Sequence, residues 1–344
     1  MKALELEAYK QLVYKDIPRP EPGPGELLIK VHACGICGSD IHGYDGSTGR
    51  RVPPVVMGHE ASGVVESLGT GAESFSKGDR VTFDSTLYCG NCYYCRKGHI
   101  NFCENRRVLG VSCDEYRQNG AYAEYVVVPE RVCYKIPEEL SFEEAALTEP
   151  LSIAVHGVEI TPLELGDDVL VVGAGMIGLL AIAVLRARGC GKIYASDIDT
   201  FKLERAKEFG ADITIDASNE SVEEVIRGRN RYGVAAALDC VGNTPSINSA
   251  IPAIRRGGTL TLVGNLSPKI EVPLQVLVSR QIRLQGSNAS SGEYPACLEL
   301  LRQGAINTGT FITAVAPLSE GVDWFERLYA AEAGLLKVVL DPAR

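Results

Sequence analysis

The chain has 344 residues, of which 45% are hydrophobic, so it carries enough apolar material for about two globular domains. Its formal net charge of −10 disfavours binding to nucleic acid or to an anionic membrane surface. No apolar run is long enough to span a membrane, and the N-terminus lacks the basic start and apolar core of a signal peptide. The sequence therefore predicts a cytoplasmic protein with no membrane partner and no nucleic-acid partner.

The first 150 residues are predicted to be mostly β-structure. Apolar and polar residues alternate at the start of the chain and again over residues 26–33, and a proline–glycine connector at residues 18–25 separates the two segments. Glycines recur to about residue 80 between short β-branched runs. A barrel-like β body of this kind can present functional residues on its loops.

Two short stretches in this part carry residue types that bind metals. The first runs from Cys37 to His42 and contains Ser39, and the second is His59-Glu60, which lies between glycines. Neighbouring side chains on a strand point to opposite faces, whereas on a bent loop both could reach one metal ion. These residue types suit zinc, but their spacing alone leaves ordinary core or surface roles open.

Four of the eleven cysteines fall within fifteen residues. They are Cys89, Cys92, Cys95 and Cys103. Four thiolates in one short lobe suit a closed tetrahedral zinc site, with His99 as an alternative to the last cysteine. An iron–sulfur cluster is disfavoured because no proline follows the fourth cysteine and no second cysteine run is present. Disulfides are disfavoured in a cytoplasmic chain.

A helix is predicted to begin after Ser141, because Ser141-Phe-Glu-Glu144 has the pattern of a capping box. The helix is expected to break before Pro150, since proline disfavours the helical conformation of the residue that precedes it. Glu149 lies at this predicted break, either as a surface charge or as a buried acid near a site.

From about residue 152 the pattern changes to alternating strands and helices, which predicts a doubly wound parallel sheet. The expected elements are 168–173, 176–188, 192–196, 200–209, 212–215, 220–228, 234–241, 244–254 and 258–263. A helix near 293–303 and a mixed tail follow.

The first turn of this region is the dinucleotide-binding fingerprint, in the strand–turn–helix–strand context that it requires. Gly173 allows the tight turn, Gly175 lets the backbone approach a pyrophosphate, and Gly178 lets helix and strand pack closely. Asp197 ends the next strand. A carboxylate there accepts hydrogen bonds from ribose hydroxyls and repels a 2′-phosphate, so the expected cofactor is NAD rather than NADP.

Further cofactor contacts are expected at the start of the helix and at the carboxyl ends of the later strands, where dinucleotides bind in such sheets. The candidates are Met176, Ile177, Lys202, Val241, Val263, Gly264, Ser287 and Asn288.

Taken together, these motifs resemble those of the zinc-containing medium-chain dehydrogenases, the alcohol dehydrogenase family. The resemblance rests on Cys37-Gly-Ser-Asp, Gly58-His59-Glu60, the four-cysteine lobe, Glu149-Pro150 and the turn from Gly173 to Gly178, and it covers essentially the whole chain. Within the family the sequence is most similar to polyol dehydrogenases of the sorbitol and galactitol-1-phosphate type. L-threonine and butanediol dehydrogenases come next.

The resemblance implies an α/β fold with two domains. A GroES-like β-barrel catalytic domain would comprise residues 1–151 and 285–344, and a Rossmann dinucleotide-binding domain would comprise residues 152–284. It also implies a homodimer or homotetramer.

The resemblance further implies two zinc ions per chain, with NAD. Cys37 and His59 would bind the catalytic zinc together with either Glu60 or Glu149, and Cys34 would not be a ligand. The four-cysteine lobe would hold the structural zinc.

In such enzymes the zinc acts as a Lewis acid toward an alcohol oxygen, and a hydride passes to the nicotinamide. Ser39 and His42 would carry the released proton to solvent. The plainer alternatives are a serine that caps a turn and a histidine that lies on the surface.

The expected function is NAD-dependent oxidation of a secondary alcohol of a polyol or sugar alcohol, phosphorylated or not, to a ketone. The alternatives are an L-threonine or 2,3-butanediol dehydrogenase and, in another class, a non-catalytic zinc-lobed dinucleotide sensor. Candidate residues along the substrate cleft are Tyr44, Tyr116, Arg117 and Tyr122. Candidates for a phosphate contact, otherwise read as solvated surface arginines, are Arg50, Arg51, Arg106 and Arg107.

Overall fold

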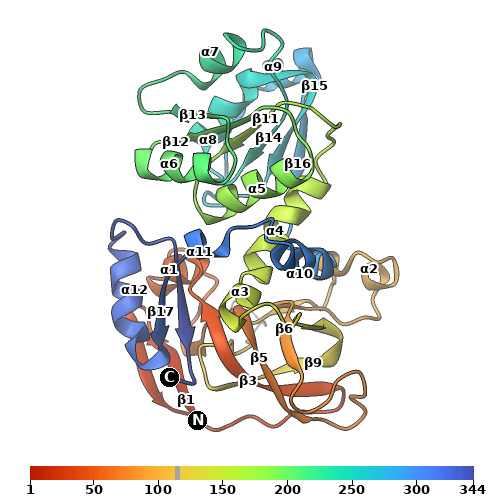
Figure 1. Ribbon diagram of the computed structural model, residues 1–344, viewed down its shortest axis with the longest axis vertical. Helices are drawn as coiled ribbons and strands as arrows, with labels where there is room; N and C mark the ends of the chain where they lie inside the picture. Colours follow the sequence, from red (N-terminus) through yellow and green to blue (C-terminus); the bar gives the residue numbers. More distant parts are fainter. Residues whose placement is uncertain (113–116) are drawn as a thin grey trace. The chain divides into compact units, whose positions relative to one another are not determined.

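The structure is a computed structural model that describes residues 1–112 and 117–344. The chain divides into two compact units, one formed by Met1–Glu149 with Tyr294–Arg344 and the other by Pro150–Glu293. Figure 1 shows that the last part of the chain, drawn in blue, returns to the strands of the first part. The boundary expected between residues 284 and 285 falls inside a strand of the second unit, and the observed division comes nine residues later, at Glu293.

The first unit is built on mostly antiparallel sheets, in which β17 and β18 alone form a parallel pair among the described strands. Its largest sheet has seven strands in the order β10-β6-β5-β3-β18-β17, with β9 paired to β3. A three-stranded sheet has the order β2-β1-β4, and β7 pairs with β8. The strands are β1 (Lys2–Ala8), β2 (Gln11–Asp16), β3 (Glu26–Gly35), β4 (Val55–Val56), β5 (Glu60–Leu68), β6 (Arg80–Phe83), β7 (Thr86–Leu87), β8 (Arg107–Val108), β9 (Tyr125–Pro129), β10 (Cys133–Lys135), β17 (Ile312–Pro317) and β18 (Lys337–Asp341).

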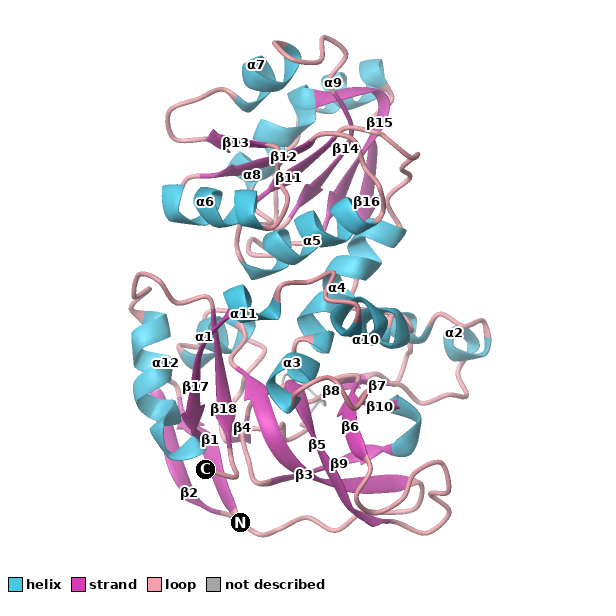
Figure 2. Ribbon diagram, viewed as in Figure 1, coloured by secondary structure: helices cyan, strands magenta, loops and turns pink. Residues whose placement is uncertain are grey.

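Short helices connect these strands along the chain and lie around the sheets (Figure 2). They are α1 (Gly38–Tyr44), α2 (Tyr93–Arg96), α3 (Phe142–Ala146), α10 (Tyr294–Arg302), α11 (Thr308–Phe311) and α12 (Gly321–Tyr329). The predicted capping box of Ser141 and Glu144 is present at the start of α3. The mostly β character expected for the first 150 residues is confirmed.

The C-terminal strand completes the main sheet of this unit. β18 pairs antiparallel with β3, where Val339 lies opposite Gly35 and Leu340 opposite Cys34. All four residues are buried. This pairing brings the chain end beside the Cys34–His42 stretch, three hundred residues earlier in the sequence. The tail is thus part of the scaffold for that stretch.

The second unit is a six-stranded parallel sheet in the order β13-β12-β11-β14-β15-β16. This is the strand order of a Rossmann fold, in which the chain reverses direction across the sheet between β11 and β14. The strands are β11 (Val169–Val172), β12 (Ile193–Asp197), β13 (Ile213–Asp216), β14 (Val234–Asp239), β15 (Ile254–Leu262) and β16 (Arg283–Gly286). The helices that connect these strands are α5 (Met176–Ala187), α6 (Thr200–Glu208), α7 (Val222–Arg227), α8 (Thr244–Ala250) and α9 (Leu274–Arg280).

One local prediction is wrong. Helix α4 (Thr148–Glu159) runs through Pro150 and does not break before it. Pro150 is in the first turn of α4, where the backbone N–H groups have no partner within the helix, so the missing N–H of proline costs nothing there. The break lies earlier, at Leu147, between α3 and α4.

Among the described residues, no helix has both the length and the apolar character needed to cross a membrane.

Candidate functional site

The first candidate metal group combines three side chains from two loops of the main sheet of the first unit. One ligand atom from each of Cys37, His59 and Glu60 lies within 4.8 Å of the others. Cys37 directly precedes α1, and Glu60 is the first residue of β5. Gly58 has φ +93°, so the chain bends just before His59. The bent-loop arrangement considered for His59 and Glu60 is therefore the one observed.

Glu60 also has a buried cationic partner that the sequence does not reveal. The Nζ of Lys337 donates to Glu60 Oε2 at 2.6 Å and to the carbonyl oxygen of Ile36 at 3.0 Å. Both charged side chains are almost fully buried. Burial works against the ammonium, but the charge of Glu60 outweighs it and raises the pKa of Lys337. The lysine therefore remains charged beside the metal group.

Glu149, the other acid considered as a ligand, is not part of this group in the structure. It is buried in the first turn of α4 and accepts a hydrogen bond from Ser85 Oγ at 3.1 Å. Burial, reinforced by the charges of Glu60 and Asp84, raises the pKa of Glu149 to about 7. A cation nearby would favour its ionised form.

A buried carboxylate, that of Asp40, lies next to the His59 ring of the metal group. Asp40 is fully buried in α1 and accepts hydrogen bonds from Arg51 Nη2 at 2.8 Å and from the Tyr122 hydroxyl at 2.8 Å. Its Oδ2 lies 3.4 Å from His59 Nδ1. Burial alone would favour the neutral acid, but the charges of His59 and Arg51 hold the pKa of Asp40 below its ordinary value. With Nδ1 facing Asp40, the other ring nitrogen of His59 is left for a metal.

This arrangement corrects two expectations. Arg51 is not a solvated surface arginine or a phosphate contact, because its side chain is only 3% exposed and is bound to Asp40. The hydroxyls of Tyr122 and Tyr44 are not offered to a substrate, because they donate to Asp40 and to the Lys10 carbonyl. The sequence carries no signal for these roles, because each depends on a partner distant in the chain.

The other residues proposed to border the substrate have different positions. Arg50, Arg107 and Arg117 are exposed, and Arg106 is half-buried with a hydrogen bond to the Asn101 carbonyl. Tyr116 lies outside the described residues.

Ser39 and His42 lie on α1, directly after the metal group. Both are exposed, and their spacing of three residues places them on one face of the helix. Ser39 Oγ accepts from Arg51 Nη2 at 3.1 Å and donates to Cys37 Sγ at 3.3 Å. Arg51 therefore links the serine to the buried Asp40.

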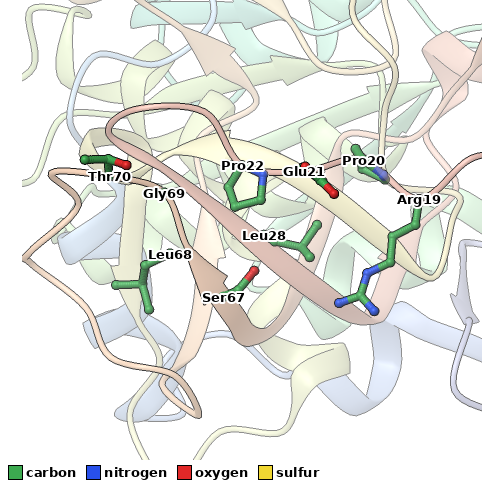
Figure 3. Close-up of a pocket in the computed structure, with 9 residues that line it drawn as sticks. All are labelled: Arg19, Pro20, Glu21, Pro22, Leu28, Ser67, Leu68, Gly69 and Thr70. Atoms are coloured by element: carbon green, nitrogen blue, oxygen red, sulfur yellow. The ribbon is translucent and has the colours of Figure 1, made fainter.

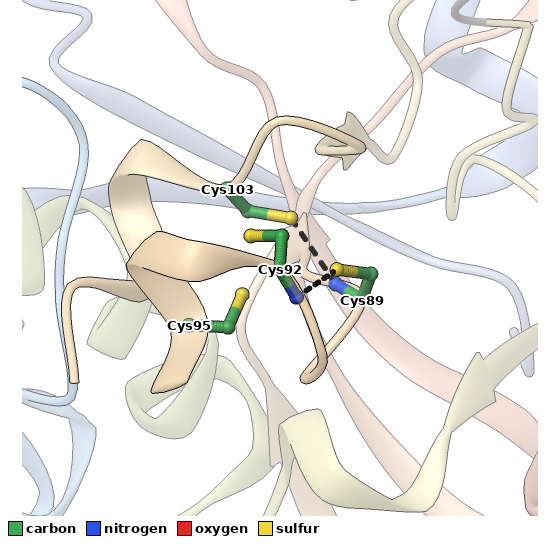
Figure 4. A group of neighbouring side chains, drawn as sticks. All are labelled: Cys89, Cys92, Cys95 and Cys103. Atoms are coloured by element: carbon green, nitrogen blue, oxygen red, sulfur yellow. Dashed lines mark hydrogen bonds between the residues drawn. The ribbon is translucent and has the colours of Figure 1, made fainter. Parts of the chain in front are cut away.

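The second candidate metal group is the cysteine lobe. Sulfur atoms of Cys89, Cys92, Cys95 and Cys103 all lie within 4.8 Å of one another, and all four are free thiols. Figure 4 shows the four sulfur atoms turned toward a common centre from the turn around Cys89, α2 and the loop after it. The backbone N–H groups of Asn91 and Cys92 lower the pKa of Cys89 to about 6. This donor set suits a tetrahedral zinc ion.

His99, the alternative fourth ligand, is not in the group. Its ring packs against Phe102 with the ring centroids 5.7 Å apart.

The glycine-rich turn of the second unit has the geometry that the fingerprint predicts. Gly173 has φ +89°, and a Cβ at Gly178 would lie 1.8 Å from the Gly173 carbonyl oxygen. Gly175 caps the N-terminus of α5, where the N–H groups are available to an anion. Asp197 Oδ2 accepts from the backbone N–H of Ala174 at 2.7 Å, so this carboxylate also braces the turn.

The remaining cofactor candidates gather where expected. Val241 follows β14, Val263 and Gly264 follow β15, and Ser287 and Asn288 follow β16, so all lie at the carboxyl edge of the sheet. Met176 and Ile177 open α5, and Lys202 lies on α6 with its Nζ 3.8 Å from Asp199.

Two of these candidates, Val241 and Ser287, have surroundings that favour a bound ligand. The Cβ that a side chain would add at Gly173 would lie 2.5 Å from Val241 Cγ2, so the chain segments after β11 and β14 are adjacent. The Ser287 hydroxyl is buried and has no hydrogen-bond partner among the described residues.

The hollow shown in Figure 3 is separate from all these residues. It has a volume of about 560 Å³. Its lining residues are Arg19, Pro20, Glu21, Pro22, Leu28, Ser67, Leu68, Gly69 and Thr70. Arg19 is paired with Glu66 at 3.3 Å and stacked over Tyr125, so the hollow offers no unpaired charge from that side chain.

Comparison with known proteins decides the family. Residues 23–138 match the alcohol dehydrogenase GroES-like domain, and residues 177–303 match the zinc-binding dehydrogenase domain. The chain is 34% identical to sorbitol dehydrogenase of Bacillus subtilis, over 100% of this chain and 98% of that protein. The chain belongs to the zinc-binding alcohol dehydrogenase family.

Two further comparisons agree with this family assignment. D-arabitol-phosphate dehydrogenase of Enterococcus avium is 34% identical over 99% of this chain and 97% of its own length. The crystal structure of a zinc-binding dehydrogenase from Sinorhizobium meliloti, bound to NADP, superposes with a TM-score of 0.91, at 33% identity and over 99% of each chain. The family, the GroES-like and Rossmann folds and the dehydrogenase class predicted from the motifs are thus confirmed.

The Asp40–Arg51 pair gives a prediction about stability. Arg51→Gln should lower the free energy of unfolding by about 3 kcal/mol, because it leaves the buried Asp40 carboxylate without its strongest partner. The neighbouring Arg50 is exposed, so Arg50→Gln should change it by less than about 0.5 kcal/mol. Urea unfolding of the two variants measures the difference, and equal losses would contradict the buried pair.

Proposed function

We propose that this dehydrogenase oxidises a secondary alcohol of a polyol or sugar alcohol to a ketone, with NAD as hydride acceptor. The observation that carries the proposal is the group of Cys37, His59 and Glu60 beside Ser39 and His42, in a chain that also holds the complete dinucleotide turn. The sorbitol and D-arabitol-phosphate dehydrogenases, each 34% identical to this chain, supply the substrate class.

In this proposal Cys37, His59 and Glu60 bind the catalytic zinc. A zinc ion held there supplies a Lewis acid that lowers the pKa of an alcohol oxygen. A thiolate, an imidazole and a carboxylate are a suitable donor set with room for a further ligand. Because Lys337 donates to the Glu60 carboxylate, Glu60 is the ligand that would bind the zinc least strongly of the three. Glu149 remains the alternative acid.

Ser39 is the proposed proton carrier. Arg51 occupies one lone pair of its hydroxyl oxygen, so the hydroxyl proton is directed away from Arg51. His42 lies on the same face of α1 and is exposed, so it can pass a proton to water.

The structural zinc is proposed for Cys89, Cys92, Cys95 and Cys103. Their lobe has few buried apolar residues of its own, and a closed site would stabilise it without taking part in the reaction.

The domain and assembly assignments are also proposals. The first unit is assigned as the catalytic domain and the second as the Rossmann domain. A homodimer or homotetramer is supported by the edge strand β16 and by exposed apolar side chains near it, namely Leu274, Val278 and Leu284. We assign the enzyme to the cytoplasm.

The two zinc sites should respond differently to substitution. Cys37→Ser should reduce zinc from two ions per chain to one and lower kcat/KM by more than about 100-fold, with little change in the midpoint of thermal unfolding. Cys92→Ser should also lose one zinc ion, but it should lower the unfolding midpoint, because the lobe depends on its metal.

Metal analysis, steady-state kinetics and thermal scans of the two variants separate these effects, with Cys190→Ser as the control that retains both ions. Full turnover in Cys37→Ser would refute the catalytic assignment.

Cofactor choice is tested at Asp197. Asp197→Asn keeps an acceptor oxygen for the Ala174 N–H but removes the charge, so the ratio of kcat/KM for NADP to that for NAD should rise by at least about tenfold. Asp199→Asn is the matched control, because Asn can still cap α6. Wild-type protein that uses NADP as efficiently as NAD would contradict the proposal.

Substrate class is tested with a panel of alcohols. Zinc-loaded protein with NAD should reduce the cofactor with sorbitol or galactitol 1-phosphate at a kcat/KM at least about tenfold above that with simple alcohols. L-threonine and 2,3-butanediol distinguish the amino-alcohol and diol alternatives. Absorbance of the reduced cofactor is the measurement. Activity with none of the compounds would favour the non-catalytic sensor.

A further inference from the structure

A basic hollow lies in the second unit, at the opposite edge of the parallel sheet from the glycine-rich turn. It has a volume of about 440 Å³. Its lining residues are Arg227, Arg231, Tyr232, Arg255, Arg256 and Arg280. These residues end α7 and α9, precede β14 and begin β15. The candidate cofactor contacts follow the carboxyl ends of the same strands, about 20 Å along a six-residue strand such as β14.

Two of the guanidinium groups that line this hollow, those of Arg227 and Arg280, are fixed in place by backbone carbonyl groups. The carbonyl oxygen of Pro252 accepts from Arg227 Nη2 at 2.7 Å and from Arg280 Nη1 at 3.1 Å. Arg280 Nη2 also donates to the Ile254 carbonyl. Two arginines thus share one acceptor, so their side chains are already ordered before any ligand arrives, which lowers the entropic cost of binding.

The positive charge of the hollow is only partly balanced. Arg227 is paired with Glu223 and Arg255 with Asp167, at 2.8 and 2.9 Å. In the part of the chain that the structure describes, the other three arginines have no ion-pair partner. Burial, followed by the charge of Arg227, lowers the pKa of Arg280. Such crowding of like charges is unfavourable in an otherwise acidic chain, and an anion would relieve it.

We propose that this hollow binds a compact anion that carries two or more linked phosphate groups, at a site distinct from that of the dinucleotide. Guanidinium groups match phosphate oxygens in charge and in bidentate geometry. A hollow ringed by a few arginines suits a short polyphosphate better than an extended nucleic-acid strand, which needs a long basic track. The phosphate groups could be free or carried by a nucleotide.

The test titrates the zinc-loaded protein with inorganic triphosphate by calorimetry, in saturating NAD so that the glycine-rich turn is filled. A second titration uses ATP, and comparison of the two affinities distinguishes a nucleotide ligand from a free polyphosphate. Zinc is measured before and after, because polyphosphates chelate metals. Binding of triphosphate or ATP at a ratio of one per chain supports the proposal, and the compound that binds more tightly indicates the source of the phosphate groups.

The informative variants are Arg256→Ala and the double variant Arg231→Ala with Arg256→Ala, since neither side chain holds a backbone carbonyl. Each substitution should weaken binding by about tenfold, and the double variant by about 100-fold. Arg229→Ala is the matched control, because Arg229 is exposed on the same segment, donates to the Val225 carbonyl and does not line the hollow. It should stay within about twofold of wild type.

Several results would overturn the proposal. They are absence of binding at physiological salt, unchanged affinity in Arg256→Ala, triphosphate binding that occurs without NAD but is lost in saturating NAD, and tighter binding of a single-stranded oligonucleotide than of triphosphate. Dissociation of the oligomer by Arg256→Ala would show that the hollow is a subunit contact instead. Should the double variant fail to fold, the single variant carries the test alone.

Discussion

The first unit depends on one buried negative charge, the carboxylate of Asp40. It is fully buried, yet Arg51, Tyr122 and His59 surround it from three separate segments of the chain. A charge in such a place costs several kcal/mol unless it is paired and hydrogen-bonded. The fold must therefore keep all three partners in position, and in doing so it fixes the His59 ring beside Cys37. The contacts that stabilise the scaffold are therefore the same contacts that set the geometry of the metal group.

A second buried ion pair, between Lys337 and Glu60, also ties the metal group to a distant segment of the chain. Lys337 reaches Glu60 only because β18 pairs with β3, so the end of the chain is needed to neutralise an acid near its beginning. Two buried acids at the metal group are thus each paired with a cation: Asp40, which adjoins the group, with Arg51, and Glu60, which belongs to it, with Lys337. The second pairing makes Glu60 a ligand that must be shared with an ammonium.

Local patterns in the sequence predicted the features that local physics determines. The turn from Gly173 to Gly178, the cysteine lobe and the capping box at Ser141 each need only residues close in sequence. The alternating elements of the second unit followed from hydrophobic periodicity for the same reason. Sequence reasoning was less successful where a side chain's role depends on a distant segment. Arg51 looked like a surface arginine because nothing near it in the chain indicates Asp40.

Pro150 shows a subtler limit. The rule that proline ends a helix is correct for helix interiors, but the same residue is well tolerated in a first turn. Whether Pro150 lies in a helix interior or in a first turn depends on where α3 ends and α4 begins, and the sequence alone did not show this boundary.

The second unit uses the direction of its parallel strands to separate two kinds of surface. At the carboxyl edge, the N-terminus of α5 and the glycine-rich turn offer backbone N–H groups, which can donate to a phosphate without placing a full charge there. At the amino edge, the strand starts and helix ends bring arginine side chains together, and full charges replace partial ones. Backbone donors suit the pyrophosphate of a dinucleotide cofactor, whose affinity must permit release in each cycle. Clustered guanidinium groups suit a ligand of higher charge, such as the proposed polyphosphate, which the dinucleotide site alone does not account for.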